Sequence, residues 1–64
     1  MNEYQEGYLM KYYPLGTYWE TDYGILKVVG YEADIDGMGY IISFETDDKK
    51  IIHIHPFFVK CQLP

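Results

Sequence analysis

Two histidines and one cysteine are the side chains of this chain best suited to metal or nucleophilic chemistry. His53 and His55 are two positions apart, so in a strand both imidazoles would lie on one face and could offer nitrogens to zinc. The spacing indicates no third ligand, and we predict surface histidines without a metal. Cys61 is the single cysteine, which excludes an intramolecular disulfide, and its apolar surroundings predict a buried, inert thiol.

One acidic segment partly matches a calcium-binding loop. Asp34, Asp36, Gly39 and Glu45 follow the EF-hand spacing, but Met38 stands where an oxygen ligand is expected. The flanking segments also have the pattern of strands, whereas the motif requires helices. We therefore predict a solvated hairpin loop. Because no phosphate loop or nucleophile with its base is present either, we expect a protein that is not an enzyme and holds no cofactor.

Charge and aromatic content indicate the kind of partner. The 64 residues include ten acidic side chains, five lysines and no arginine, for a net charge of −5, and 19% are aromatic. Scattered lysines cannot neutralise a phosphate backbone, so direct nucleic-acid binding is not expected. An acidic surface with many tyrosines suits docking on a basic protein surface. The alternative is that the tyrosines cover a thin core.

The length allows one small domain. Hydrophobic residues make up 48% of the chain, which is typical of a globular protein, but no apolar run approaches the roughly 20 residues of a membrane span. The acidic N-terminal residues lack the pattern of a secretory signal, and we expect a cytoplasmic protein.

Residues 1–15 form a segment of their own. Tyr4, Tyr8, Leu9 and Tyr12 recur at the spacing of one helix face, and Pro14 would end a helix near Tyr12. Gly7 weakens this helix, and the alternative is an extended first strand.

Residues 16–64 have the pattern of a mainly β domain. β-branched and aromatic runs alternate with turn residues, and Pro56 interrupts the ladder because it has no N–H to donate. The predicted strands are Thr17–Thr21, Ile25–Ala33, Tyr40–Thr46, Ile51–His55 and Val59–Leu63, with a 3₁₀ turn at His55–Phe58 before the last.

Alternation of side chains along the strands predicts the core face. The residues expected there are Leu26, Val28, Tyr40, Ile42, Phe44, Ile52 and Ile54. Ile25, Val29 and Tyr31 would make the other face partly apolar, with a bend at Gly30. That face would be covered by the N-terminal segment, a second copy or the target.

This order resembles the SH3-like small β-barrel class, which includes SH3, Tudor and KOW modules. The resemblance extends over Gly16–Tyr31, Gly39–Phe44 and His55–Val59. It implies a single barrel of about five short strands with a 3₁₀ turn before the last. It carries over no functional residues, because neither a proline-peptide groove nor a full methyl-lysine cage can be placed.

We expect a protein-binding module, an inhibitor or accessory factor that occupies a basic, nucleic-acid-binding surface of a larger protein. Such proteins resemble phage or mobile-element inhibitors of host and defence enzymes. The predicted aromatic anchors are Tyr18, Trp19, Tyr23 and Tyr31, and the acidic rim is Glu20, Asp22, Asp34 and Asp36. The alternatives are a cleft around Trp19 and Tyr23 that binds a modified peptide or small cation, and a subunit of a homo-oligomer.

Overall fold

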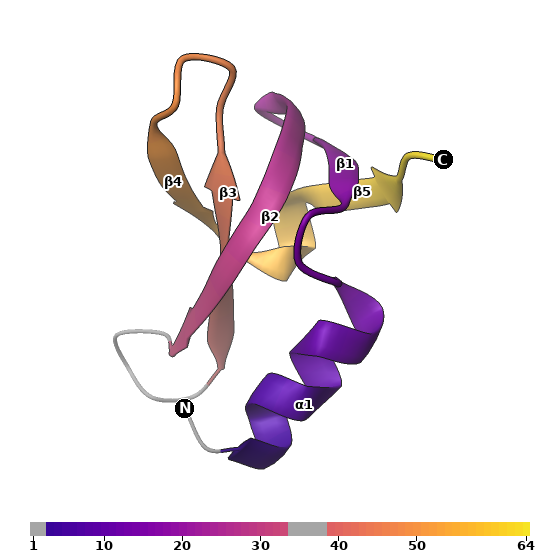
Figure 1. Ribbon diagram of the computed structural model, residues 1–64, viewed down its shortest axis with the longest axis vertical. Coiled ribbons are helices and arrows are strands. Elements are labelled where there is room, and N and C mark those ends of the chain that lie inside the picture. Colours follow the sequence, from indigo (N-terminus) through magenta and orange to yellow (C-terminus); the bar gives the residue numbers. More distant parts are fainter. Residues whose placement is uncertain (1–2, 34–38) are drawn as a thin grey trace.

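A five-stranded antiparallel sheet with one short helix forms the described part of the chain (Figure 1). The computed structural model describes residues 3–33 and 39–64. The elements in chain order are α1 (Glu3–Tyr12), β1 (Tyr18–Thr21), β2 (Gly24–Ala33), β3 (Tyr40–Glu45), β4 (Ile51–Ile54), the 3₁₀ helix η1 (Pro56–Phe58) and β5 (Val59–Gln62). The predicted mainly β class is confirmed, and each strand lies within one residue of its predicted bounds.

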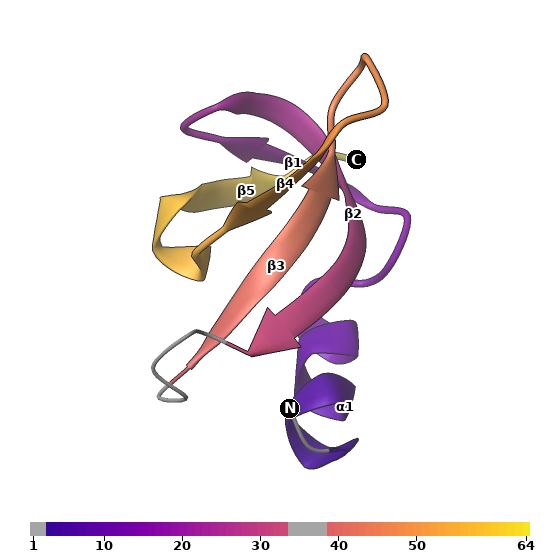
Figure 2. The same cartoon turned by 90° about the vertical axis from the view of Figure 1, so that its left-hand side faces the viewer.

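The strands are ordered β4-β3-β2-β1-β5 across the sheet. β2 and β3 form the long central pair, and the sheet curls around them (Figure 2). β4 and β5 are the outer strands and do not pair with each other in the part of the chain that is described, so the sheet is not closed into a barrel.

The core lies on one face of β2, β3 and β4. Its buried members are Leu26, Val28, Ile42, Phe44 and Ile54, as the alternation predicted. Half-buried side chains close its margin, and these are Tyr13, Trp19, Tyr31, Ile52 and Val59. Tyr40 is also half-buried.

A bulge in β2 changes the face of Tyr31. Val28 pairs with Phe44 but Gly30 pairs with Ser43, so the register shifts by one residue between them. The extra residue brings Tyr31 opposite Ile42, on the core side. The prediction that Tyr31 lies on the outer face is therefore wrong, because strict alternation fails across a bulge.

Within the N-terminal segment, residues 3–12 form a helix, and the alternative of a first strand is wrong. Leu9 is fully buried, and the ring centroids of Tyr13 and Trp19 are 5.0 Å apart. The hydroxyl of Tyr31 donates a hydrogen bond to the carbonyl oxygen of Tyr13. α1 thus lies beside the end of the sheet where β2 ends and β3 begins (Figures 1 and 2). Ile25 remains exposed, so the helix does not cover the outer face there.

The tyrosines around α1 make the stability of the fold sensitive to alkaline pH. Burial raises the pKa of Tyr13 and of Tyr40 above the ordinary value of 10.0, and the neighbouring tyrosines raise it further. The unfolded chain therefore releases these protons at a lower pH than the folded chain. We expect the free energy of unfolding to fall as pH rises from about 10 through the folded pKa values, because the unfolded state then binds fewer protons.

Urea unfolding at a series of pH values measures this loss. Replacing Tyr13 and Tyr40 by Phe should flatten the dependence above pH 10, whereas Tyr18→Phe, at an exposed position, serves as the control. An unchanged alkaline slope in the double variant would contradict the assignment.

Candidate functional site

Two neighbouring turns present aromatic side chains to solvent. The first joins β1 to β2 and is organised by the buried Thr21, whose hydroxyl donates to the carbonyl oxygen of Gly24 at 2.8 Å and accepts from the N–H of Tyr23 at 3.0 Å. Gly24 has φ of 109°, a conformation that side-chain-bearing residues rarely adopt. This turn therefore holds Tyr23 in an exposed position.

The second turn is η1, and its backbone is fixed at both ends. His55 caps it, since its Nδ1 accepts from the N–H of Phe57 at 3.3 Å and its carbonyl oxygen accepts from the N–H of Phe58 at 2.9 Å. The N–H of Val59 donates to the carbonyl oxygen of Pro56. Three successive residues of a 3₁₀ helix point in three directions, so they cannot all face the core. Phe57 is 84% exposed.

The two turns are joined, and together they form one surface. The N–H of Asp22 donates to the carbonyl oxygen of Phe58 at 3.1 Å. The ring centroids of Phe57 and Phe58 are 5.6 Å apart and those of Tyr23 and Phe58 6.5 Å, both edge to face. We call Tyr23, Phe57 and Phe58 the aromatic turn surface. Sequence reasoning missed both phenylalanines, although the geometry of a 3₁₀ turn could have indicated them.

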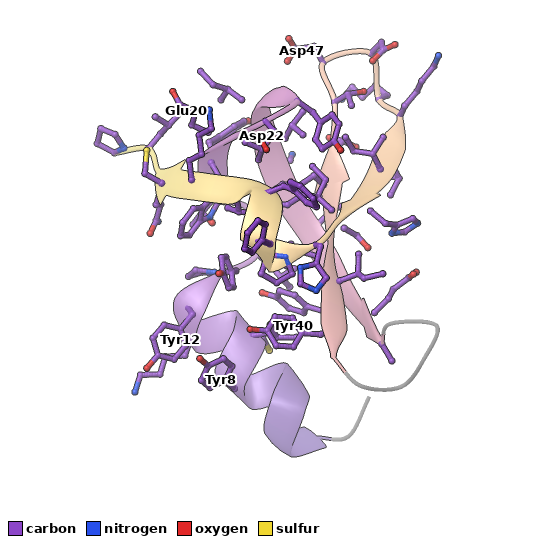
Figure 3. The ribbon with its side chains drawn as sticks, turned by 180° about the vertical axis from the view of Figure 1, so that it is seen from behind. Tyr8, Tyr12, Glu20, Asp22, Tyr40 and Asp47 are labelled. Atoms are coloured by element: carbon purple, nitrogen blue, oxygen red, sulfur yellow. The ribbon has the colours of Figure 1, made fainter. Side chains whose placement is uncertain are left out.

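Three carboxylates lie in the half of the molecule away from α1. They are Glu20, Asp22 and Asp47 (Figure 3). Asp22 pairs with Lys60 at 3.5 Å, whereas Glu20 and Asp47 have no basic side chain within 4.0 Å among the residues described. Of the four carboxylates predicted as an acidic rim, Glu20 and Asp22 lie in this half, and Asp34 and Asp36 lie outside the described residues.

The predicted aromatic anchors separate into two groups. Tyr18 and Tyr23 are exposed, whereas Trp19 and Tyr31 pack against the core. The indole Nε1 of Trp19 donates to Thr17 Oγ1 at 2.9 Å. Trp19 stacks near Tyr13 while Tyr23 contacts Phe58, so the contacts of these two rings do not outline a common cleft.

The histidines have separate structural partners. His53 Nδ1 lies 3.0 Å from Ser43 Oγ and 3.6 Å from Glu32 Oε2. A hydrolytic relay needs the hydroxyl and the acid on opposite ring nitrogens, so this trio does not have that geometry. Within residues 3–33 and 39–64, no three His, Cys, Asp or Glu side chains gather as a metal site would require. The segment of the calcium-loop pattern at 34–38 lies outside the described residues.

Cys61 is exposed, so the prediction of a buried thiol is wrong. The reason is the register of β5 against β1, which shifts between Glu20 and Thr21. Val59 pairs with the buried Thr21, whereas Cys61 pairs with the exposed Glu20 and lies with it on the solvent side.

A shallow pocket of about 170 Å³ lies on the outer face of the sheet. It is bordered by β1, β2 and the loop between β3 and β4. Its lining residues are Tyr18, Ile25, Lys27, Glu45, Thr46, Asp47 and Lys49. Lys27 and Glu45 form an ion pair within it at 3.5 Å.

Comparisons with protein-family models, with curated proteins and with solved structures found no match. The structure shows a small mainly β domain with one helix and an aromatic surface at two joined turns. Of the helices that the structure describes, none has the length and apolar character needed to cross a bilayer.

Proposed function

We propose that this protein is a non-enzymatic protein-binding module whose aromatic turn surface occupies a basic surface of a larger protein, as an inhibitor or accessory factor. The supporting observation is Phe57, 84% exposed on a turn whose backbone is hydrogen-bonded at both ends. Burying a phenylalanine side chain contributes about 1.5–3 kcal/mol. Because the turn is already ordered, little conformational entropy is lost when a partner covers it.

Charge supports a basic partner. The chain carries −5 overall, and Glu20 and Asp22 lie in β1 and in the turn that bears Tyr23. Opposite charge on the partner would accelerate association and orient the complex. A basic surface is typical of proteins that bind nucleic acid. By covering that surface, the module would block access of the nucleic acid.

The fold proposal is an SH3-like small barrel. The strand order and the 3₁₀ helix immediately before β5 support it. An experimental structure in which β4 and β5 converge at the open side of the sheet would establish the class, and a flat, open sheet would exclude it.

The test is affinity capture with three forms of the full chain as bait: wild type, Phe57→Ser and Ile51→Ser. Ile51 is 50% exposed on β4 and serves as the matched control. A specific partner should be retained by wild type and by Ile51→Ser, and its purified form should bind Phe57→Ser at least about tenfold more weakly. Wild-type binding should also weaken as salt rises.

Two results would refute this proposal. Equal affinity of the Phe57→Ser and wild-type proteins for the purified partner would remove the aromatic turn surface as the contact centre. Retention of only further copies of the chain would instead indicate self-assembly.

A further inference from the structure

The pocket on the outer face is separate from the aromatic turn surface, since the two share no residue. Tyr18 of β1 and Ile25 of β2 are both more than half exposed and provide its apolar part. Its charged part comes from β2, the end of β3 and the loop that follows. The pocket therefore combines an apolar wall with charge, as a site for an amphipathic side chain requires.

The size of the pocket limits what it can hold. Its volume of about 170 Å³ is well below the roughly 300–1,000 Å³ of pockets that enclose small-molecule ligands. One long side chain is a suitable occupant, whereas a cofactor is too large.

The ion pairs around the pocket leave one carboxylate available. Glu45 is neutralised by Lys27 at 3.5 Å. Asp48, the neighbour of Asp47, accepts a hydrogen bond from the hydroxyl of Thr46 and pairs with Lys50 at 3.8 Å. The Thr46 bond lowers the pKa of Asp48, with a smaller contribution from the backbone. Asp47 is exposed and has no basic side chain within 4.0 Å in the described part of the chain.

Lys49 is the remaining charge at the pocket. It is exposed, and it occupies a left-handed turn position with φ of 68°. Its ammonium is carried on a flexible four-carbon stem, so it can turn into solvent when another cation approaches Asp47.

We propose that this pocket receives one arginine side chain of the basic partner. Its methylene stem packs against Ile25, its planar guanidinium stacks on Tyr18, and two of its N–H groups donate to the carboxylate of Asp47. That this arginine belongs to a protein partner rests on the proposed function. The binding of arginine by the pocket does not depend on that function.

The experiment is an NMR titration of the ¹⁵N-labelled full chain with N-acetylarginine amide. We expect saturable shifts of the amides of Ile25 and Thr46. The citrulline analogue keeps the shape and loses the charge, and should bind at least about fivefold more weakly. N-acetyllysine amide should be intermediate, because its ammonium cannot stack or form a bidentate contact.

Two variants with the same charge change localise the effect. Asp47→Asn should weaken arginine binding at least about fivefold, whereas Glu32→Gln, whose carboxylate lies near His53 in another part of the sheet, should leave it unchanged. Far-ultraviolet circular dichroism checks that both variants fold.

Three results would overturn the pocket proposal: equal binding of arginine and citrulline analogues, equal loss in both variants, or the same shifts with N-acetylaspartate amide. The last would indicate an anion site at Lys27 and Lys49. Phe57→Ser tests the other surface independently. If that variant loses the partner while arginine does not bind, only the pocket proposal fails, and the converse result removes only the aromatic turn surface.

Discussion

Phe44→Ala is expected to lower the free energy of unfolding by about 3–5 kcal/mol. Phe44 lies on β3 with 0% of its surface exposed, and its cross-strand neighbours are Val28 and Ile52. Removing the ring leaves a cavity that two hydrogen-bonded neighbouring strands cannot close. A domain of this length has a total stability of roughly 3–10 kcal/mol, so this loss is a large fraction of the whole. Urea denaturation followed by circular dichroism measures the loss.

Phe57→Ala is the matched control, because it removes the same atoms from a side chain that is 84% exposed. Its free energy of unfolding should change by no more than about 0.5 kcal/mol. Equal effects of the two substitutions would mean that Phe44 is not central to the core or that the side chain of Phe57 is not exposed.

Trp19→Ala should also destabilise the fold, by about 2–4 kcal/mol. The indole is half-buried against the core, its ring centroid lies 5.0 Å from that of Tyr13, and its N–H is bonded to Thr17. The substitution therefore removes packing both within the sheet and against Tyr13, the residue that follows α1. Thermal and urea unfolding of the variant measure the effect.

Tyr23→Ala provides the comparison, since Tyr23 is exposed and contacts only Phe58 among the described aromatic rings. Its stability should remain close to wild type while its partner affinity falls. A Trp19→Ala protein with wild-type stability and reduced partner affinity would instead restore Trp19 as a surface anchor.

The strands were predictable because local chemistry marks their ends. The polar loop after β3 and Pro56 after β4 both interrupt a β ladder, and Pro14 ends α1. The bulge was not predictable, because one extra residue in β2 is a local backbone event. Gly30 marked the place but could not indicate that Tyr31 would change face.

The candidate site was less predictable than the fold. The exposure of Tyr23 follows directly from its place in a turn. The burial of Trp19 depends on the core and on Tyr13, and the sequence pattern does not define where Tyr13 packs. By residue type alone, Phe57 and Phe58 would be expected in the core. Their exposure follows only from the short repeat of the 3₁₀ helix.

The hydrogen bond between Asp22 and Phe58 joins parts of the chain that are distant in sequence. Such pairings close a long loop of the chain, which costs conformational entropy. β5 belongs to an outer position of the sheet, where local opening is easiest, and amide hydrogen exchange should be fastest there. A partner that binds the aromatic turn surface would keep β5 paired with β1. Binding of the partner should therefore slow hydrogen exchange of the β5 amides. The proposed recognition surface therefore requires that β5 is paired with β1.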